Sequence, residues 1–198
     1  MSKKLSLAIL LSGNGTNFQA IVDSIENGRL KAAIKIVISN NKDAFGLKRA
    51  KKHNIKNLCL DHKDFEDRKS YDQKLKEVIK QESVDFIILA GFMRILGSDF
   101  VKNFPNKIIN IHPSLLPKFG GKGFYGHHVH KSVLESNEEE SGITIHLVNE
   151  KYDEGKILFQ KSTPIFDNDD VASLSSRIHN LEYKYYPQII EKYLLNQL

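Results

Sequence analysis

The chain has 198 residues, of which 40% are hydrophobic and 27% are charged, so it is long and apolar enough to bury a core and is not disordered over most of its length. The net charge of +5 suits an anionic small molecule as well as a nucleic acid and does not decide between them. The single cysteine, Cys59, excludes an internal disulfide framework and a cysteine-built metal site, which is consistent with a reducing cytoplasm. No apolar run approaches the roughly 20 residues of a membrane helix.

Strand and helix signals alternate through the first part of the chain. Uninterrupted apolar runs predict buried strands, and apolar residues at helical spacing predict helices between them. Asn17 is placed to cap the first helix and Gly28 to end it. The repeated pattern predicts an α/β, Rossmann-like, mostly parallel sheet with helices on both faces. The expected strands are 5–11, 33–39, 55–60, 84–90 and 107–111, and the expected helices are 18–27, 44–53 and 69–81.

The pattern changes after about residue 142. Residues 143–148 alternate apolar and polar side chains, and a second strand, 157–165, follows a turn that contains Asp153 and Gly155. Two strands with a short link predict an antiparallel hairpin at the far edge of the sheet. Residues 169–196 predict a long C-terminal helix, kinked near Pro187. No Pro- or Ser-rich linker divides the chain, so we expect a single domain over 1–198.

A glycine-rich turn, Ser12-Gly-Asn-Gly-Thr-Asn17, separates the first strand from the first helix. Glycines let a ligand approach the backbone, and a helix N-terminus presents unpaired N–H groups to an anion. The turn lacks the third glycine of a dinucleotide site, because position 18 is Phe, and it lacks the Lys of an ATP-binding loop. It therefore favours the phosphate of a small ligand, although a tight turn without a ligand would show the same pattern.

A second polar group stands at the end of the strand 107–111. Asn110 and His112 have period-two spacing, so both point to one side at the edge where parallel sheets bind ligands. An amide donor beside an imidazole suits a developing oxyanion and a proton transfer. Leu116-Pro117 in the stiff loop that follows is a candidate cis bond. Spacing alone does not decide whether Asp153 is catalytic or an ordinary turn residue.

Four segments, at 11–17, 89–96, 109–117 and 142–160, resemble phosphoribosylglycinamide formyltransferase in order and spacing. This family of the formyltransferase superfamily moves a formyl group from 10-formyltetrahydrofolate to glycinamide ribonucleotide in purine synthesis. The resemblance implies that activity, with the reduced folate as co-substrate and no metal. It implies small-molecule partners rather than a nucleic acid or a membrane, a cytoplasmic location, and a monomer or homodimer.

The resemblance also assigns residues. Arg177 and Glu182 both fit the family's ribonucleotide contacts by spacing, and we assign Glu182. The catalytic residues implied are Asn110, His112 and Asp153; the ribonucleotide-binding residues are Gly15, Thr16, Asn17 and Glu182; the folate-binding residues are Arg68, Met93, Arg94, Ile95, Leu96 and Asn110. Without the resemblance, Met93–Leu96 would be interpreted as core.

The loop 118–130 is longer and richer in glycine than in much of the family. The spacing of His127, His128 and His130 within it offers no carboxylate or cysteine as a further metal ligand, so we expect a helix start and not a metal site. His146 alternates with apolar neighbours and is expected to be a hydrogen-bonded structural residue. Asp153 is expected to raise the pKa of His112 and to keep it protonated or nearly so.

Three competing functions remain. The nearest is a sister enzyme, methionyl-tRNA formyltransferase or formyltetrahydrofolate hydrolase. The expectation that this chain has neither the C-terminal domain of the first nor the regulatory domain of the second, together with the phosphate turn, favours a ribonucleotide acceptor. A non-catalytic folate- or nucleotide-binding module is disfavoured by the retained catalytic trio. A Rossmann oxidoreductase is disfavoured by the missing third glycine and the missing acidic residue for the ribose.

Overall fold

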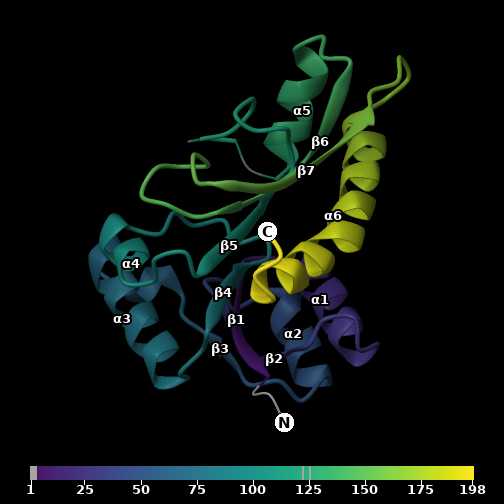
Figure 1. The fold of residues 1–198 in the computed structure, drawn as a ribbon. Helices are drawn as coiled ribbons and strands as arrows, with labels where there is room; N and C mark the ends of the chain where they lie inside the picture. Colours follow the sequence, from purple (N-terminus) through teal and green to yellow (C-terminus); the bar gives the residue numbers. More distant parts are fainter. Residues whose placement is uncertain (1–3, 122, 125) are drawn as a thin grey trace.

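The computed structural model describes residues 4–121, 123–124 and 126–198 (Figure 1). Lys122 and Tyr125 of the glycine-rich loop lie outside the described residues. The strands are β1 (Leu5–Leu11), β2 (Ala32–Ser39), β3 (Asn57–Cys59), β4 (Phe86–Leu89), β5 (Ile108–His112), β6 (Glu140–Leu147) and β7 (Ile157–Pro164). The α-helices are α1 (Thr16–Glu26), α2 (Phe45–Lys52), α3 (Arg68–Gln81), α4 (Ser98–Lys102), α5 (His127–Glu135) and α6 (Val171–Leu194), and a 3₁₀ turn spans His62–Asp64.

All seven strands form one sheet in the order β3-β2-β1-β4-β5-β6-β7. The strands from β3 to β5 pair in parallel, and β6 and β7 add an antiparallel hairpin at one edge. The predicted fold class is therefore confirmed. The order reverses between β1 and β4, so the loops that leave β1, β4 and β5 lie at the same end of the sheet.

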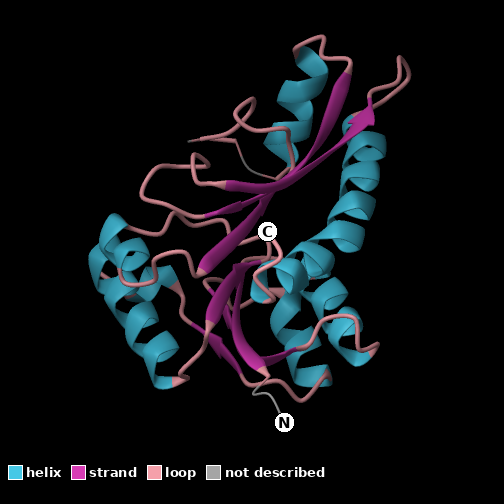
Figure 2. Cartoon of the chain, in the orientation of Figure 1, coloured by secondary structure: helices cyan, strands magenta, loops and turns pink. Residues whose placement is uncertain are grey.

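Helices cover both faces of the sheet (Figure 2). The buried residues of α1, α5 and α6 share a core cluster with Leu7 and Ile9 of β1, whereas those of α3 and α4 share a second cluster with Ala8 and Leu10. Successive residues of a strand point to opposite faces, so a strand buried on both faces must be apolar throughout. This requirement explains why β1 is apolar without a break from Leu7 to Leu11, after Ser6, whose hydroxyl donates to Asp85.

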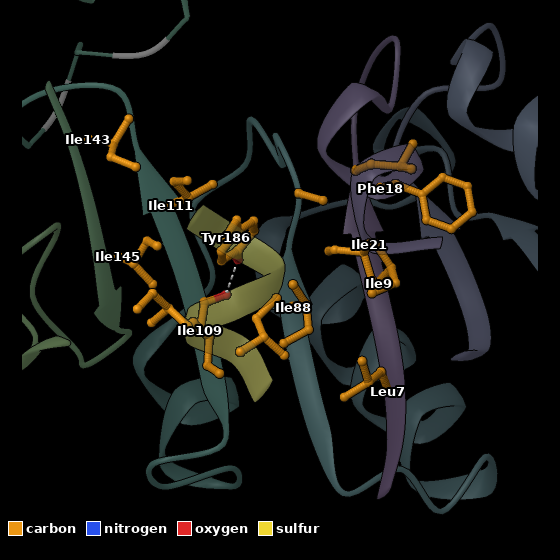
Figure 3. Packing of buried hydrophobic residues seen from close by; sticks show 14 of the residues in the cluster. Leu7, Ile9, Phe18, Ile21, Ile88, Ile109, Ile111, Ile143, Ile145 and Tyr186 are labelled. Carbon is orange, nitrogen blue, oxygen red and sulfur yellow. Dashed lines mark hydrogen bonds between the residues drawn. The ribbon is translucent and has the colours of Figure 1, made fainter. Parts of the chain in front are cut away.

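Helix α6 fastens the centre of the sheet. Its residue Tyr186 is fully buried, and the hydroxyl lies 2.9 Å from the carbonyl oxygen of Leu89 and 3.0 Å from that of Ile109. Figure 3 shows Tyr186 above β4 and β5, next to Ile88 and Ile109. One hydroxyl therefore contacts both strands from which the candidate site loops depart. Helix α6 contains Pro187 and changes direction along its course (Figure 1), as the predicted kink requires.

Apolar and polar residues alternate along β6 as expected, yet both kinds are buried. Ile143 and Ile145 face the core cluster of α6 (Figure 3), while Thr144 and His146 point to the opposite face. Thr144 and His146 are polar because they face hydrogen-bonding partners near the end of β5, and not because they are exposed to water.

Two local predictions were wrong or too long. Asn17 does not cap α1: the N-cap is Gly15, with φ +67°, and Asn17 is the second residue of the helix. The strands expected at 55–60 and 84–90 are shorter, at Asn57–Cys59 and Phe86–Leu89, although Leu60 and Ala90 just beyond them still donate to the neighbouring strands. The Leu116-Pro117 bond is cis, as expected. No helix within residues 4–121, 123–124 and 126–198 is long and apolar enough to cross a bilayer.

Candidate active site

Asn110 and His112 lie side by side on the face of β5 that points away from the α6 core. Their neighbours Ile109 and Ile111 belong to that core. Across the antiparallel pairing with β6, Asn110 stands opposite His146 and His112 stands opposite Thr144. The turn between β6 and β7 brings Asp153 to the same place. The structure thus brings together the three residues to which the resemblance assigns catalysis.

His112 is 5% exposed and held by two neighbours. Its Nε2 donates to the carbonyl oxygen of Phe119 at 2.7 Å, and its Nδ1 lies 3.7 Å from Oδ2 of Asp153. Burial lowers the pKa of His112 below the ordinary value of 6.5 and outweighs the opposite effect of Asp153. Asp153 does act to raise this pKa, as expected, but burial prevails, so the expectation that the ring stays protonated was wrong for the protein without substrate.

Asp153 is fixed in a left-handed backbone conformation, with φ +54°. Its Oδ2 accepts a hydrogen bond from the N–H of Gly121 at 2.9 Å, and its Oδ1 lies 3.6 Å from Nε2 of His146. Burial alone would raise the pKa of Asp153, but the proximity of His112 and the hydrogen bond from the Gly121 N–H lower it. The carboxylate is therefore ionised and faces both imidazoles.

His146 orients the Asn110 amide. Nδ1 of His146 lies 2.9 Å from the carbonyl oxygen of Leu147 and donates to it, so in the neutral ring Nε2 is an acceptor. Nδ2 of Asn110 lies 3.2 Å from that Nε2 and donates to it. This contact fixes which end of the amide is the nitrogen and leaves its second N–H free. The hydrogen-bonded role expected for His146 agrees with this geometry.

Thr144 fixes the loop that follows His112, a role that the sequence analysis missed. Its hydroxyl donates to the carbonyl oxygen of Ser114 at 2.7 Å and accepts from the N–H of Leu116 at 3.0 Å. Gln160 of β7 bridges the same hydroxyl and the Leu116 carbonyl. The signal was present in the sequence, because Thr144 is one of the polar residues of the alternating strand.

The glycine-rich turn presents the N-terminus of α1. Gly15 approaches α2 so closely that a Cβ there would lie 2.7 Å from Cα of Gly46. The turn is tied to α2 by the N–H of Gly46, which donates to the Gly13 carbonyl at 3.0 Å, and by Nε of Arg49, which donates to the Asn14 carbonyl at 2.9 Å. The first N–H groups of a helix have no partner within it, so this end of α1 can take an anion.

Glu182 of α6 reaches the same turn. It is 5% exposed, and its Oε2 accepts from Nδ2 of Asn17 at 2.9 Å. Burial raises the pKa of Glu182 to about 7. The side-chain amide of Asn17 is therefore occupied by Glu182, and its backbone N–H is the donor that remains for an anion. Arg177 does not join them, because it forms an ion pair with Asp169 and also donates to the Pro164 carbonyl.

In the loop over residues 91–97, Phe92 and Leu96 pack against the core, whereas Met93 and Ile95 do not. Met93 is 53% exposed and Ile95 is 39% exposed, which argues against core packing as the reason for these apolar residues. The guanidinium of Arg94 lies over the ring of Tyr71, 5.0 Å from its centroid. Arg68, the first residue of α3, lines a groove of about 640 Å³ together with Gly97 at the end of this loop.

Among the histidines of α5, His130 lies near enough to His112 for that ring to help lower its pKa. His130 is buried and faces His179 of α6, with 6.5 Å between the ring centroids, and burial lowers its pKa to about 4. Helix α5 begins at His127, as the helix-start interpretation expects. In the part of the chain that the structure describes, no group of three or more His, Cys, Asp or Glu residues could hold a metal ion.

Sequence comparison relates this chain to known formyl transferases and to proteins of purine biosynthesis. The family model for "Formyl transferase" matches residues 5–190. The phosphoribosylglycinamide formyltransferase of Escherichia coli is 38% identical over 186 residues, covering 94% of this chain and 85% of that protein. The trifunctional purine biosynthetic protein adenosine-3 of Drosophila pseudoobscura is 45% identical over 93% of this chain, which spans only 13% of its length.

Solved structures agree with the sequence comparison. The crystal structure of glycinamide ribonucleotide transformylase 1 from Symbiobacterium toebii superposes with a TM-score of 0.93 at 35% identity, covering 99% of this chain and 90% of that one. A phosphoribosylglycinamide formyltransferase from Bacillus halodurans has a TM-score of 0.90 at 33% identity, with 96% of this chain and 95% of that chain covered.

Proposed function

Because this chain belongs to the formyl transferase family, we propose that it transfers the formyl group of 10-formyltetrahydrofolate to the amine of glycinamide ribonucleotide, a step of purine synthesis. The observation that carries the proposal is the meeting of Asn110, His112 and Asp153 beyond the end of β5. Relatives that cover most of this chain at 38% identity bear the corresponding name. The proposal treats residues 1–198 as one catalytic domain.

The ribonucleotide is assigned to the glycine-rich turn. Backbone N–H groups of Gly15, Thr16 and Asn17 at the start of α1 bind its phosphate, because the helix N-terminus is electropositive. Glu182 lies one hydrogen bond beyond Asn17 and is placed to bind hydroxyl groups of the same ligand. Since the side chain of Asn17 already contacts Glu182, the phosphate contact of Asn17 is made by its backbone.

The folate is assigned to the 91–97 loop and Arg68. Met93 and Ile95 expose apolar surface that suits a flat pteridine ring, and the loop is irregular, so its backbone groups can bond the polar edge of that ring. Arg68 supplies a cation for an acidic group at the other end of the folate. Asn110 lies next to the formyl group of the folate, at the point where the two substrates meet.

Asn110 and His112 stabilise charge during the transfer. The neutral amine of the ribonucleotide attacks the formyl carbon, and the carbonyl oxygen becomes an oxyanion. The second N–H of Asn110, left free by His146, donates to that oxygen. His112 stabilises it further and passes a proton to the departing folate nitrogen. These two donors supply the charge stabilisation, so the proposed reaction asks for no metal.

Asp153 supports the imidazolium form of His112. Because burial favours the neutral ring, protonation during the reaction needs the ionised carboxylate 3.7 Å from Nδ1. Asp153 can also organise a water that passes the amine proton to His112, so that the ring regains the proton that it gives to the folate nitrogen. His112 reaches the substrate only after Nε2 leaves the carbonyl of Phe119, so substrate binding has to displace that segment.

Two sister activities use the same donor with another acceptor, methionyl-tRNA or water. The α1 turn favours a small phosphorylated acceptor. Because both proposed substrates are small molecules, the proposed reaction needs no nucleic-acid or membrane partner. A monomer or homodimer and a cytoplasmic location remain predictions.

One assay separates the acceptors. 10-Formyltetrahydrofolate is supplied with glycinamide ribonucleotide, with initiator methionyl-tRNA, or with water alone, and formation of tetrahydrofolate is followed in each. We expect turnover with the ribonucleotide and background rates in the other two. Faster consumption with methionyl-tRNA, or equal consumption with water alone, would replace the proposed acceptor.

A further inference from the structure

The 91–97 loop has an unusual support. It contains no helix or strand, and the side chain of Met93 points outward, whereas its neighbour Phe92 packs against the core. Within the described residues, the main-chain groups of Arg94, Ile95 and Leu96 make no hydrogen bond. The shape of the loop must therefore be set from its two ends, and its middle is left with unpaired backbone donors and acceptors for a ligand.

Ser12 holds the first end. Its N–H donates to the carbonyl oxygen of Gly91 at 3.0 Å, and its Oγ accepts the N–H of Met93 at 2.7 Å. The hydroxyl proton is given to Oδ1 of Asn40 at 2.5 Å, so the remaining lone pairs of Oγ are free to accept from Met93. One hydroxyl thus joins the loops that follow β1, β2 and β4, three neighbouring strands of the sheet.

Asp72 holds the second end. It is 8% exposed on α3, and its Oδ2 accepts the N–H of Gly97 at 2.8 Å. A Cβ at Gly97 would lie only 2.6 Å from the same oxygen, so the carboxylate seats directly against the backbone. Next to it, the Tyr71 ring supports the guanidinium of Arg94. Both supports come from side chains outside the loop.

We propose that Ser12 and Asp72 are positioning residues for the folate co-substrate, because they hold the two ends of the 91–97 loop and leave its middle for the ligand. The inference rests on the proposed function, which assigns this loop to the folate. Ser12 is the first residue of the turn assigned to the ribonucleotide phosphate. Its hydroxyl, however, supports the loop assigned to the folate.

Steady-state kinetics of Ser12→Ala test this separation. Loss of one hydrogen bond to a loop should raise the KM for 10-formyltetrahydrofolate about five- to tenfold, with the KM for the ribonucleotide and kcat within about twofold of wild type. Ser12→Thr keeps the hydroxyl and should restore the folate KM. Asp72→Ala should act like Ser12→Ala, and Asp72→Asn, which keeps an oxygen for Gly97, should be close to wild type.

The matched control is Ser173→Ala. This serine also forms hydroxyl hydrogen bonds, with Asp169 and Asp170 at the start of α6, but far along the chain from the loop. Its loss should leave the folate KM unchanged. An unchanged folate KM in Ser12→Ala, or an equal rise in both KM values, would overturn the inference.

Equilibrium binding separates this inference from the proposed function. Tetrahydrofolate is titrated into wild type and Ser12→Ala without any acceptor. Weaker binding by the variant supports the positioning role even if the wild type transfers no formyl group to the ribonucleotide, a result that would sink only the proposed function. Equal binding by both proteins, in a wild type that is active with the ribonucleotide, would sink the positioning role alone.

Discussion

His112 lies 3.7 Å from the Asp153 carboxylate, yet burial sets the direction of its pKa. The ring is nine-tenths enclosed by protein, and its Nε2 hydrogen is taken by the Phe119 carbonyl. Removal of an imidazolium from water disfavours the charged form more than a single carboxylate beyond hydrogen-bonding distance favours it. The free protein therefore keeps a neutral His112, which becomes charged only as the reaction develops.

Asp153→Asn tests this balance. Removal of the negative charge takes away the main influence that favours imidazolium, so the pKa of His112 should fall further below 6.5. The measurement is a titration of the His112 ring by NMR in both proteins. A wild-type pKa above 6.5, or a rise in the variant, would show that the carboxylate and not burial dominates.

The catalytic residues differed in how far the sequence could find them. Period-two spacing at the end of a strand placed Asn110 and His112 together without help. Asp153 came only from the resemblance, because a turn residue far along the chain has no local pattern that marks its partner. Contacts made by a carbonyl or a backbone N–H, such as those of Phe119 and Gly121, leave no signal in side-chain types.

The turn between β6 and β7 positions Asp153 by close backbone contact. A Cβ at Gly155 would lie 1.7 Å from the carbonyl oxygen of Leu147, a distance that no movement of a side chain relieves. The backbone therefore passes Leu147 only with glycine at this position. The conformation of the turn is fixed two residues beyond the carboxylate that it presents.

Gly155→Ala should displace this turn and take Asp153 out of reach of His112. We expect a fall in kcat of at least about tenfold, because misplacing a catalytic group by about an ångström is costly, while the Kd for the ribonucleotide changes little. Glu154→Ala, which removes an exposed side chain from the same turn, is a suitable control. Unchanged kcat in Gly155→Ala would mean that the turn does not position the carboxylate.

At the level of elements, the sequence predicted strands better than caps. Strand β1 has the expected bounds, because a strand buried on both faces is apolar at nearly every position, here all but Ser6. The cap of α1 was misplaced, because Asn17 looks like a capping residue until Glu182 of α6 claims its amide. That contact joins residues from opposite ends of the chain, which local propensity does not register.

Over the whole molecule, α6 ties the sheet to the candidate site. Tyr186 contacts carbonyls of β4 and β5, and one turn earlier Glu182 contacts the start of α1. Glu182 is buried, which raises its pKa to about 7 from an ordinary 4.5. The buried His130 on α5 shows the opposite effect, with a pKa of about 4 in place of 6.5.

These two groups make opposite contributions to stability between about pH 4.5 and 6.5. The folded state keeps a proton on Glu182 that the unfolded state loses, so as pH rises from 4.5 to 7 Glu182 lowers the free energy of unfolding, by about 3 kcal/mol in all. His130 is neutral when folded and charged when unfolded, so as pH rises from 4 to 6.5 it raises the same free energy.

Glu182→Gln removes the contribution of Glu182 to the pH dependence of the unfolding free energy and leaves that of His130. Relative to wild type, the variant should gain stability steadily as the pH rises from 4.5 to 7.5, since the buried amide never has to ionise. Urea unfolding of both proteins across this range measures the difference. Parallel curves of unfolding free energy against pH would show that Glu182 has an ordinary pKa in the folded protein.

The central claim is that Asn110 stabilises the oxyanion of a formyl transfer to glycinamide ribonucleotide, and Asn110→Ala tests it most directly. Single-turnover transfer and ribonucleotide binding are measured on the same preparation. The account predicts a fall in the transfer rate of roughly 10²–10³-fold with a ribonucleotide Kd close to wild type. Transfer at a near wild-type rate, or loss of ribonucleotide binding in step with the rate, would contradict it.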